Sequence, residues 1–100
     1  MSVGKILSAT KLRELMPGAL VFRGGCSDCN DIANLQTGIY RTDYASINTP
    51  DGAKWGYMIV ISEDYRRGTV MLHIGIAPCQ VSVRGYNQSM EQMPDWRILT

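Results

Sequence analysis

Two apolar runs separated by a single turn constrain the fold of this chain more than any other feature. Residues 55–62 read WGYMIVIS, residues 69–76 read TVMLHIGI, and the polar stretch EDYRRG lies between them. Both runs are too short to cross a membrane and are rich in β-branched side chains, which pack well on a pleated sheet. The pattern predicts an antiparallel hairpin with Gly68 in its turn and a first strand that is central and buried.

Other short strand-like runs lie on both sides of this hairpin. Turn-forming residues separate them, most clearly NTPDGAK at 48–54. The additional runs are 19–24, 38–45, 80–86 and 96–99. Strands of this length, spaced about 8–12 residues apart, are typical of small all-β domains. The sequence therefore predicts a mainly β fold, with short antiparallel strands in a compact sheet or a barrel-like knob.

A helix is predicted only near the N-terminus. In ILSATKLRELM, residues 6–16, three apolar side chains (Leu12, Leu15 and Met16) share one helical face. Pro17 and Gly18 then end the helical pattern. We therefore expect a helical segment at 1–17, a single β-rich domain at 18–100, and a small α+β fold overall.

Composition narrows the function classes. Ten basic residues nearly balance nine acidic ones, so the charge gives no reason to expect binding to nucleic acid or to an anionic membrane. No apolar run approaches the roughly 20 residues of a membrane helix, and the first residues lack the apolar core of a secretory signal. We expect a protein that is made in the cytoplasm, with no membrane insertion and no nucleic-acid partner.

Three cysteines and one histidine form the sharpest local pattern. Cys26 and Cys29 are separated by two residues, and His73 and Cys79 follow much later. An odd, small number of cysteines does not indicate a disulfide framework. The four residues leave three alternatives: plain thiols with a structural or surface histidine, a Cys26–Cys29 disulfide, or a structural zinc site of the Cys₃His type. A surface histidine would also be able to face its symmetry mates in an oligomer and make assembly sensitive to pH.

Nothing in the sequence predicts catalysis. The carboxylates lie mostly in predicted turns, and no nucleophile elbow or phosphate-binding loop is present. We expect no enzymatic activity, no catalytic residue and no cofactor. Binding is a better expectation, because aromatic and basic residues gather at strand–turn borders. The candidate ligand-binding residues are Trp55, Tyr65, Arg66, Arg67 and Tyr86, and Trp55 either packs in the core or contacts a ligand.

Several short motifs follow one another in a fixed order between residues 19 and 99. They are Asp31 with Asn34 and Leu35, Gly38-Ile39-Tyr40, Asn48-Thr49-Pro50, Gly56–Val60, Val70–Ile74, Arg84, and Trp96–Leu99. In this order they resemble the knob domains at the tips of phage tail fibres and pyocin fibres. The last motif of such knobs often holds two tryptophans three residues apart, and here Met93 stands at the first of these positions.

The resemblance implies a specific setting. It implies a bacteriophage virion protein, a homotrimer that acts at a fibre tip or attached to the particle. Its partners would be other virion proteins or a host surface receptor, for example a polysaccharide, and Tyr40 and Trp96 would be packing residues. The alternative from the cysteine pattern is a small intracellular zinc-binding or regulatory module that uses Cys26 and Cys29.

Overall fold

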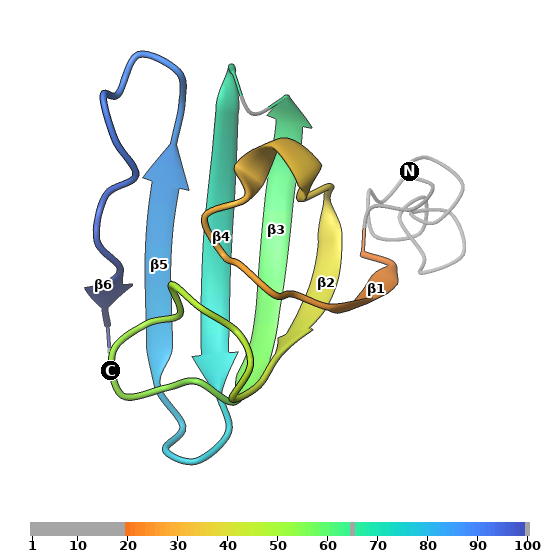
Figure 1. Cartoon of the computed structure of the whole chain (residues 1–100), viewed down its shortest axis with the longest axis vertical. Coiled ribbons are helices and arrows are strands. Elements are labelled where there is room, and N and C mark those ends of the chain that lie inside the picture. Colours follow the sequence, from red (N-terminus) through yellow and green to blue (C-terminus); the bar gives the residue numbers. More distant parts are fainter. Residues whose placement is uncertain (1–19, 65, 100) are drawn as a thin grey trace, which may run out of the picture.

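The computed structural model describes residues 20–64 and 66–99, which form one six-stranded sheet and a short 3-10 turn. The elements are β1 (Phe22–Gly25), η1 (Ile32–Asn34), β2 (Gly38–Thr42), β3 (Gly56–Asp64), β4 (Gly68–Gly75), β5 (Val81–Tyr86) and β6 (Arg97–Ile98). The strands lie side by side in chain order, with β3 and β4 at the centre of the sheet (Figure 1).

The mainly β class, the six strands and the central hairpin are confirmed. Strands β3 and β4 pair antiparallel from Gly56 opposite Gly75 to Asp64 opposite Gly68. Of the two predicted arrangements, the sheet is the one observed: it is open and not closed into a barrel. The expectation that the strands are antiparallel is corrected at one edge, because β1 pairs parallel to β2. The parallel pair arises because the chain crosses over the sheet between the two strands, through η1, before β2 begins (Figure 1). The predicted helix at 6–16 lies outside the described residues.

One face of the sheet, called here the covered face, carries the core. The segments that join the strands pass over this side, as Figure 1 shows for η1 and for the loop before β3. The buried apolar side chains are few: Cys26, Cys29, Leu35, Tyr40, Ala53, Met58, Val60 and Met71. Partly buried Ile32, Met93 and Trp96 pack against this cluster. Tyr40 and Trp96 are thus packing residues, as the resemblance implied.

The same covered face also buries polar side chains. They are Thr42, Thr69, His73, Ser82 and Arg84, together with Ser46 from a loop. Their hydrogen-bond partners come partly from the loops: Ser46 Oγ donates to the carbonyl of Cys26 at 2.6 Å. Loops carry unpaired backbone groups, so a sheet face covered by loops needs polar partners.

The opposite side of the sheet, called here the open face, is mainly aliphatic and largely exposed to solvent. Register places the odd-numbered residues of β3 beside the even-numbered residues of β4 and the odd-numbered residues of β5. The open face is therefore built from Ile39, Tyr57, Ile59, Ile61, Val70, Leu72, Ile74, Val81 and Val83, with one arginine toward each edge, Arg41 opposite Tyr57 and Arg97 opposite Val83. Ile61 is 60% exposed and Val70 52%. The expectation that β3 is buried on both faces is therefore wrong for the single chain.

Gly56 lies opposite Gly75, where the backbone of β4 leaves no room for a side chain. A Cβ atom at this position would collide with the carbonyl oxygen of Ile74 and lie 2.9 Å from the Cα of Gly75. Only glycine fits this close backbone approach. None of the helices in the described part of the chain is long and apolar enough to span a membrane.

Candidate functional site: a polar groove beside Trp96

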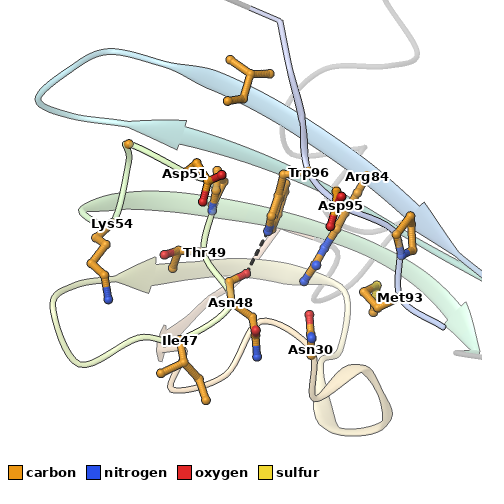
Figure 2. A pocket seen from close by; sticks show the side chains of 14 residues that line it. Asn30, Ile47, Asn48, Thr49, Asp51, Lys54, Arg84, Met93, Asp95 and Trp96 are labelled. Carbon is orange, nitrogen blue, oxygen red and sulfur yellow. Dashed lines mark hydrogen bonds between the residues drawn. The ribbon is translucent and has the colours of Figure 1, made fainter.

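The covered face holds a groove of about 690 Å³ at its β5–β6 side. One wall is the loop at 47–54, the other is the segment at 93–98, and Arg84 of β5 lies between them (Figure 2). Its polar lining residues are Asn30, Asn48, Thr49, Asp51, Lys54, Arg84 and Asp95, with Trp96 as the aromatic member. These side chains come from distant parts of the chain that the sheet brings together.

Trp96 is fixed in place on three sides. Its indole Nε1 donates to the carbonyl of Asn48 at 2.8 Å (Figure 2). The guanidinium carbon of Arg84 lies 4.3 Å from the centre of the indole ring, within the range of a cation–π contact. The imidazole of His73 meets the indole edge-on, with ring centres 6.0 Å apart. A tryptophan held in this way gives the groove a rigid aromatic surface.

Arg84 brings a buried positive charge to the groove. Its side chain is only 8% exposed, and its Nη2 donates to the carbonyl of Cys29 at 2.6 Å. Burial lowers the pKa of the guanidinium, and the nearby charge of Asp28 opposes that effect. Within the described ranges no carboxylate forms an ion pair with Arg84. An arginine keeps its proton in proteins, so this charge persists in the groove.

Asp28 and Asn48 shape the wall that faces Trp96. Asp28 Oδ1 accepts hydrogen bonds from the Asn48 side-chain amide at 2.8 Å and from the backbone N–H of Asn30 at 2.9 Å. These two bonds, the one from Asn48 first, lower the pKa of Asp28. Asn48 has a φ of 60°, in the left-handed region that asparagine tolerates better than most residues. This backbone position is the one that offers the Asn48 carbonyl to the indole.

Several groove side chains keep their hydrogen-bonding capacity. In the portion of the chain that the structure describes, the side chains of Asn30, Thr49, Asp51 and Asp95 make no hydrogen bond, and Lys54 Nζ makes one, to the carbonyl of Ser46 at 3.2 Å. Two cations, Lys54 and Arg84, balance the two aspartates. The groove therefore offers donors, acceptors and an aromatic side chain, and the side chains that line it carry no net charge.

The ligand-binding residues predicted from the sequence lie elsewhere. Trp55 stands just before β3 and stacks edge-on against Tyr44, with ring centres 5.2 Å apart. Arg66 and Arg67 are in the β3–β4 turn, at the other end of β3, and Arg67 pairs with the exposed Glu63 at 3.1 Å. Strand β3 has nine residues, so at about 3.3 Å per step its two ends lie roughly 26 Å apart. These residues do not form one site.

The last two predicted residues do not change this result. Tyr86, at the end of β5, is opposite Thr69 and so lies near the β3–β4 turn. It lines a shallower depression with residues 30–33 and Met93. Tyr65 lies outside the described residues. None of the described members of the predicted set lines the groove beside Trp96.

The four residues considered for zinc are not gathered into a cluster. The Sγ atoms of Cys26 and Cys29 lie 3.9 Å apart as buried free thiols, and Cys79 is exposed in the β4–β5 turn. Among the residues described, no group of three or more His, Cys, Asp or Glu side chains is placed to hold a metal. The contact with Cys26 and then burial raise the pKa of Cys29, which favours a neutral thiol.

His73 is structural and not a surface residue. Its side chain is fully buried, and Nε2 lies 2.8 Å from Thr42 Oγ1. Its Nδ1 is a buried nitrogen without a hydrogen-bond partner. The idea that His73 faces its symmetry mates is therefore wrong, because the loops of its own chain cover it. Burial lowers its pKa, so the imidazole is neutral near pH 7.

Sequence reasoning missed the groove because its walls read as ordinary turn residues. The sequence indicates a turn at 48–54, with Asn48-Thr49-Pro50 as one of the ordered motifs, and a packing role for Trp96. The one available signal was the number of amide, hydroxyl and carboxylate side chains in that turn. Comparisons of the chain with protein-family models, with curated proteins and with solved structures gave no match. The function is therefore argued from the geometry of the site.

Proposed function

We propose that this chain is a non-enzymatic recognition domain that binds a neutral, hydroxyl-rich ligand, a segment of a cell-surface oligosaccharide, in the groove beside Trp96. One observation carries the proposal: unused hydrogen-bonding side chains surround a rigid aromatic residue in a groove without net charge. Sugars present hydroxyl groups that need donors and acceptors, and their apolar ring faces pack on aromatic rings. Balanced charges favour a neutral ligand over an ion.

The setting we propose is a bacteriophage virion, with the domain at a fibre tip or attached to the particle. The ordered motifs from Asp31 to Trp96 support this setting, and so does the β-rich fold. In that setting the host surface supplies the receptor, and copies of the chain assemble as a homotrimer with other virion proteins. The groove side of each copy would then face outward.

Direct binding measurements test the ligand class. The probes are a panel of neutral hexose and N-acetylhexosamine oligosaccharides, titrated by calorimetry and by chemical-shift mapping. We expect weak binding that shifts the Trp96 indole resonance. Asp51→Ala and Asp95→Ala should each weaken binding about 2- to 10-fold, the range for losing one hydrogen bond.

Glu91→Ala is the matched control, because Glu91 is an exposed carboxylate outside the groove and should not affect binding. The absence of binding to the whole panel at millimolar concentration would overturn the proposed ligand class. If Asp51→Ala and Glu91→Ala bind the saccharide with the same affinity, the saccharide binds outside the groove.

A further inference from the structure

The open face is the least explained surface of the molecule. All eight isoleucines in the described residues lie outside the buried core, and four of them, Ile39, Ile59, Ile61 and Ile74, are on the open face. The face bears no charge between Tyr57 and Ile61 of β3, or across the facing positions of β4 and β5, and its two arginines, Arg41 of β2 and Arg97 of β6, lie toward the edges. A sheet usually turns its aliphatic side inward, and here the less apolar side is the one that the loops cover.

The face extends across the whole sheet. Phe22 of β1 is in register with Ile39 and is 54% exposed. At the other edge, the N–H of Leu99 donates to the carbonyl of Val81, and Leu99 is 52% exposed. With about 4.8 Å between strands and 3.3 Å per residue, the face measures roughly 30 Å by 20 Å, or about 600 Å². That area approaches the roughly 800 Å² that each partner buries in a standard interface.

A helix at residues 6–16, where the sequence predicts one, would be too small to cover this face. A helix formed by residues 6–16 would be about 16 Å long and 10 Å wide, so it would cover roughly a quarter of the area. The open face of another copy has the same width and the same aliphatic composition. Two sheets pack face to face about 10 Å apart through interdigitating aliphatic side chains, which is the chemistry that this surface presents.

We infer that copies of this chain associate through the open face, with the aliphatic side chains of β3, β4 and β5 at the centre of the interface. Loops bring unpaired backbone groups, but a second sheet brings only side chains, so an aliphatic face suits a sheet and not another loop. This inference rests on the proposed function only for the number of copies in the assembly. The geometry sets the surface, and two copies that meet through it alone form a two-fold pair; the proposed trimer requires three open faces to meet around one axis.

Light scattering coupled to size-exclusion chromatography tests the inference on the full chain. The wild type should elute as an oligomer at micromolar and submillimolar concentrations. Ile74→Lys should weaken association about 100-fold or more, because the interface would bury an unpaired charge. Met90→Lys is the matched control: Met90 and Ile74 are both 38% exposed, but Met90 lies in the loop after β5, off the open face.

Ile61→Lys provides a second variant, since at 60% exposure a lysine there fits the single chain without strain. Monomeric Ile74→Lys and Ile61→Lys, beside an oligomeric Met90→Lys, would support the inference. A monomeric wild type, or oligomers that persist equally in all three variants, would overturn it. A wild-type dimer lost in the two isoleucine variants would support the interface but overturn the proposed trimer. Saccharide binding by the monomeric variants would show that the groove works independently of assembly.

Discussion

The two faces of the sheet carry different kinds of side chain, although both faces are built from the same strands. On β3, Met58 and Val60 point to the covered face and are fully buried, whereas Tyr57 and Ile61 point to the open face and are exposed. On the covered face Arg84 donates to a loop carbonyl, that of Cys29, whereas other polar side chains pair with one another: His73 with Thr42, and Ser62 with Thr69. The open face offers no such partners and is aliphatic. What covers a sheet face decides how polar that face can be.

Neighbouring residues on β3 provide the strongest test of this comparison. Met58→Ala should lower the free energy of unfolding by about 3 kcal/mol, because it leaves a cavity in the core. This loss should be nearly the same at every protein concentration. Ile59→Ala should cost about 1 kcal/mol in the dilute protein, and its cost should grow as the protein concentration rises and the open face becomes buried. Urea unfolding at several protein concentrations measures both.

The same experiment can contradict the comparison. If Ile59→Ala costs the same at all concentrations, the open face stays in water. If Met58→Ala costs less than Ile59→Ala in the dilute protein, the assignment of the two faces is wrong.

Arg84 tests how the loops are held on the covered face. Arg84→Ala should lower the free energy of unfolding by about 2 kcal/mol, because the Cys29 carbonyl loses its donor and the indole loses its stacking partner. It should also make Trp96 more accessible to a fluorescence quencher, measured in a Trp55→Phe background. Arg84→Met restores volume but not the hydrogen bond, so it should be milder. Unchanged quenching in Arg84→Ala would show that the stack does not position Trp96.

Local patterns predicted the strands but not how the loops are arranged. The hairpin of β3 and β4 follows from two β-branched runs and one turn, all within neighbouring residues. The groove depends on contacts between distant residues: Trp96 bonds to a residue 48 positions away, and Arg84 to one 55 positions away. Alternation shows that a strand has two faces but not which one the loops will cover. The sequence likewise does not show that the aromatic residues at the strand ends lie at opposite ends of the sheet and so form no single site.

The buried histidine predicts a dependence of stability on pH. Burial lowers the pKa of His73 in the folded state, whereas the unfolded chain has a pKa of about 6.5. Below that pH the unfolded state binds a proton that the folded state excludes. The contribution of neutral His73 to stability should therefore be fully present above about pH 6.5. It should decrease as the pH falls from 6.5 to the lowered pKa of the folded state. Urea midpoints between pH 8 and pH 5 measure this slope, and His73→Gln should flatten it.

Asp28 gives a control in a separate pH range. Because its pKa is lowered in the folded state, Asp28 contributes to the stability of the fold above the pKa of the unfolded chain, about 3.9. This contribution is lost as the pH falls below that value. Asp28→Asn should leave the slope between pH 8 and pH 5 intact and change only the behaviour in stronger acid. A His73→Gln profile as steep as that of the wild type would assign the slope to other groups.

The smallest expected effect concerns the three cysteines, because it is a difference in thiol reactivity and not in the stability of the fold. Cys79 is exposed in the β4–β5 turn, whereas Cys26 and Cys29 belong to the loop between β1 and η1 and their side chains are buried. A chromogenic disulfide reagent should therefore modify one thiol per folded chain at once, and the other two only as fast as the loops open. Cys79→Ser should remove the fast phase. If Cys26 and Cys29 react as fast as Cys79, the loops do not shield the covered face, and the contrast between the two faces would have to be abandoned.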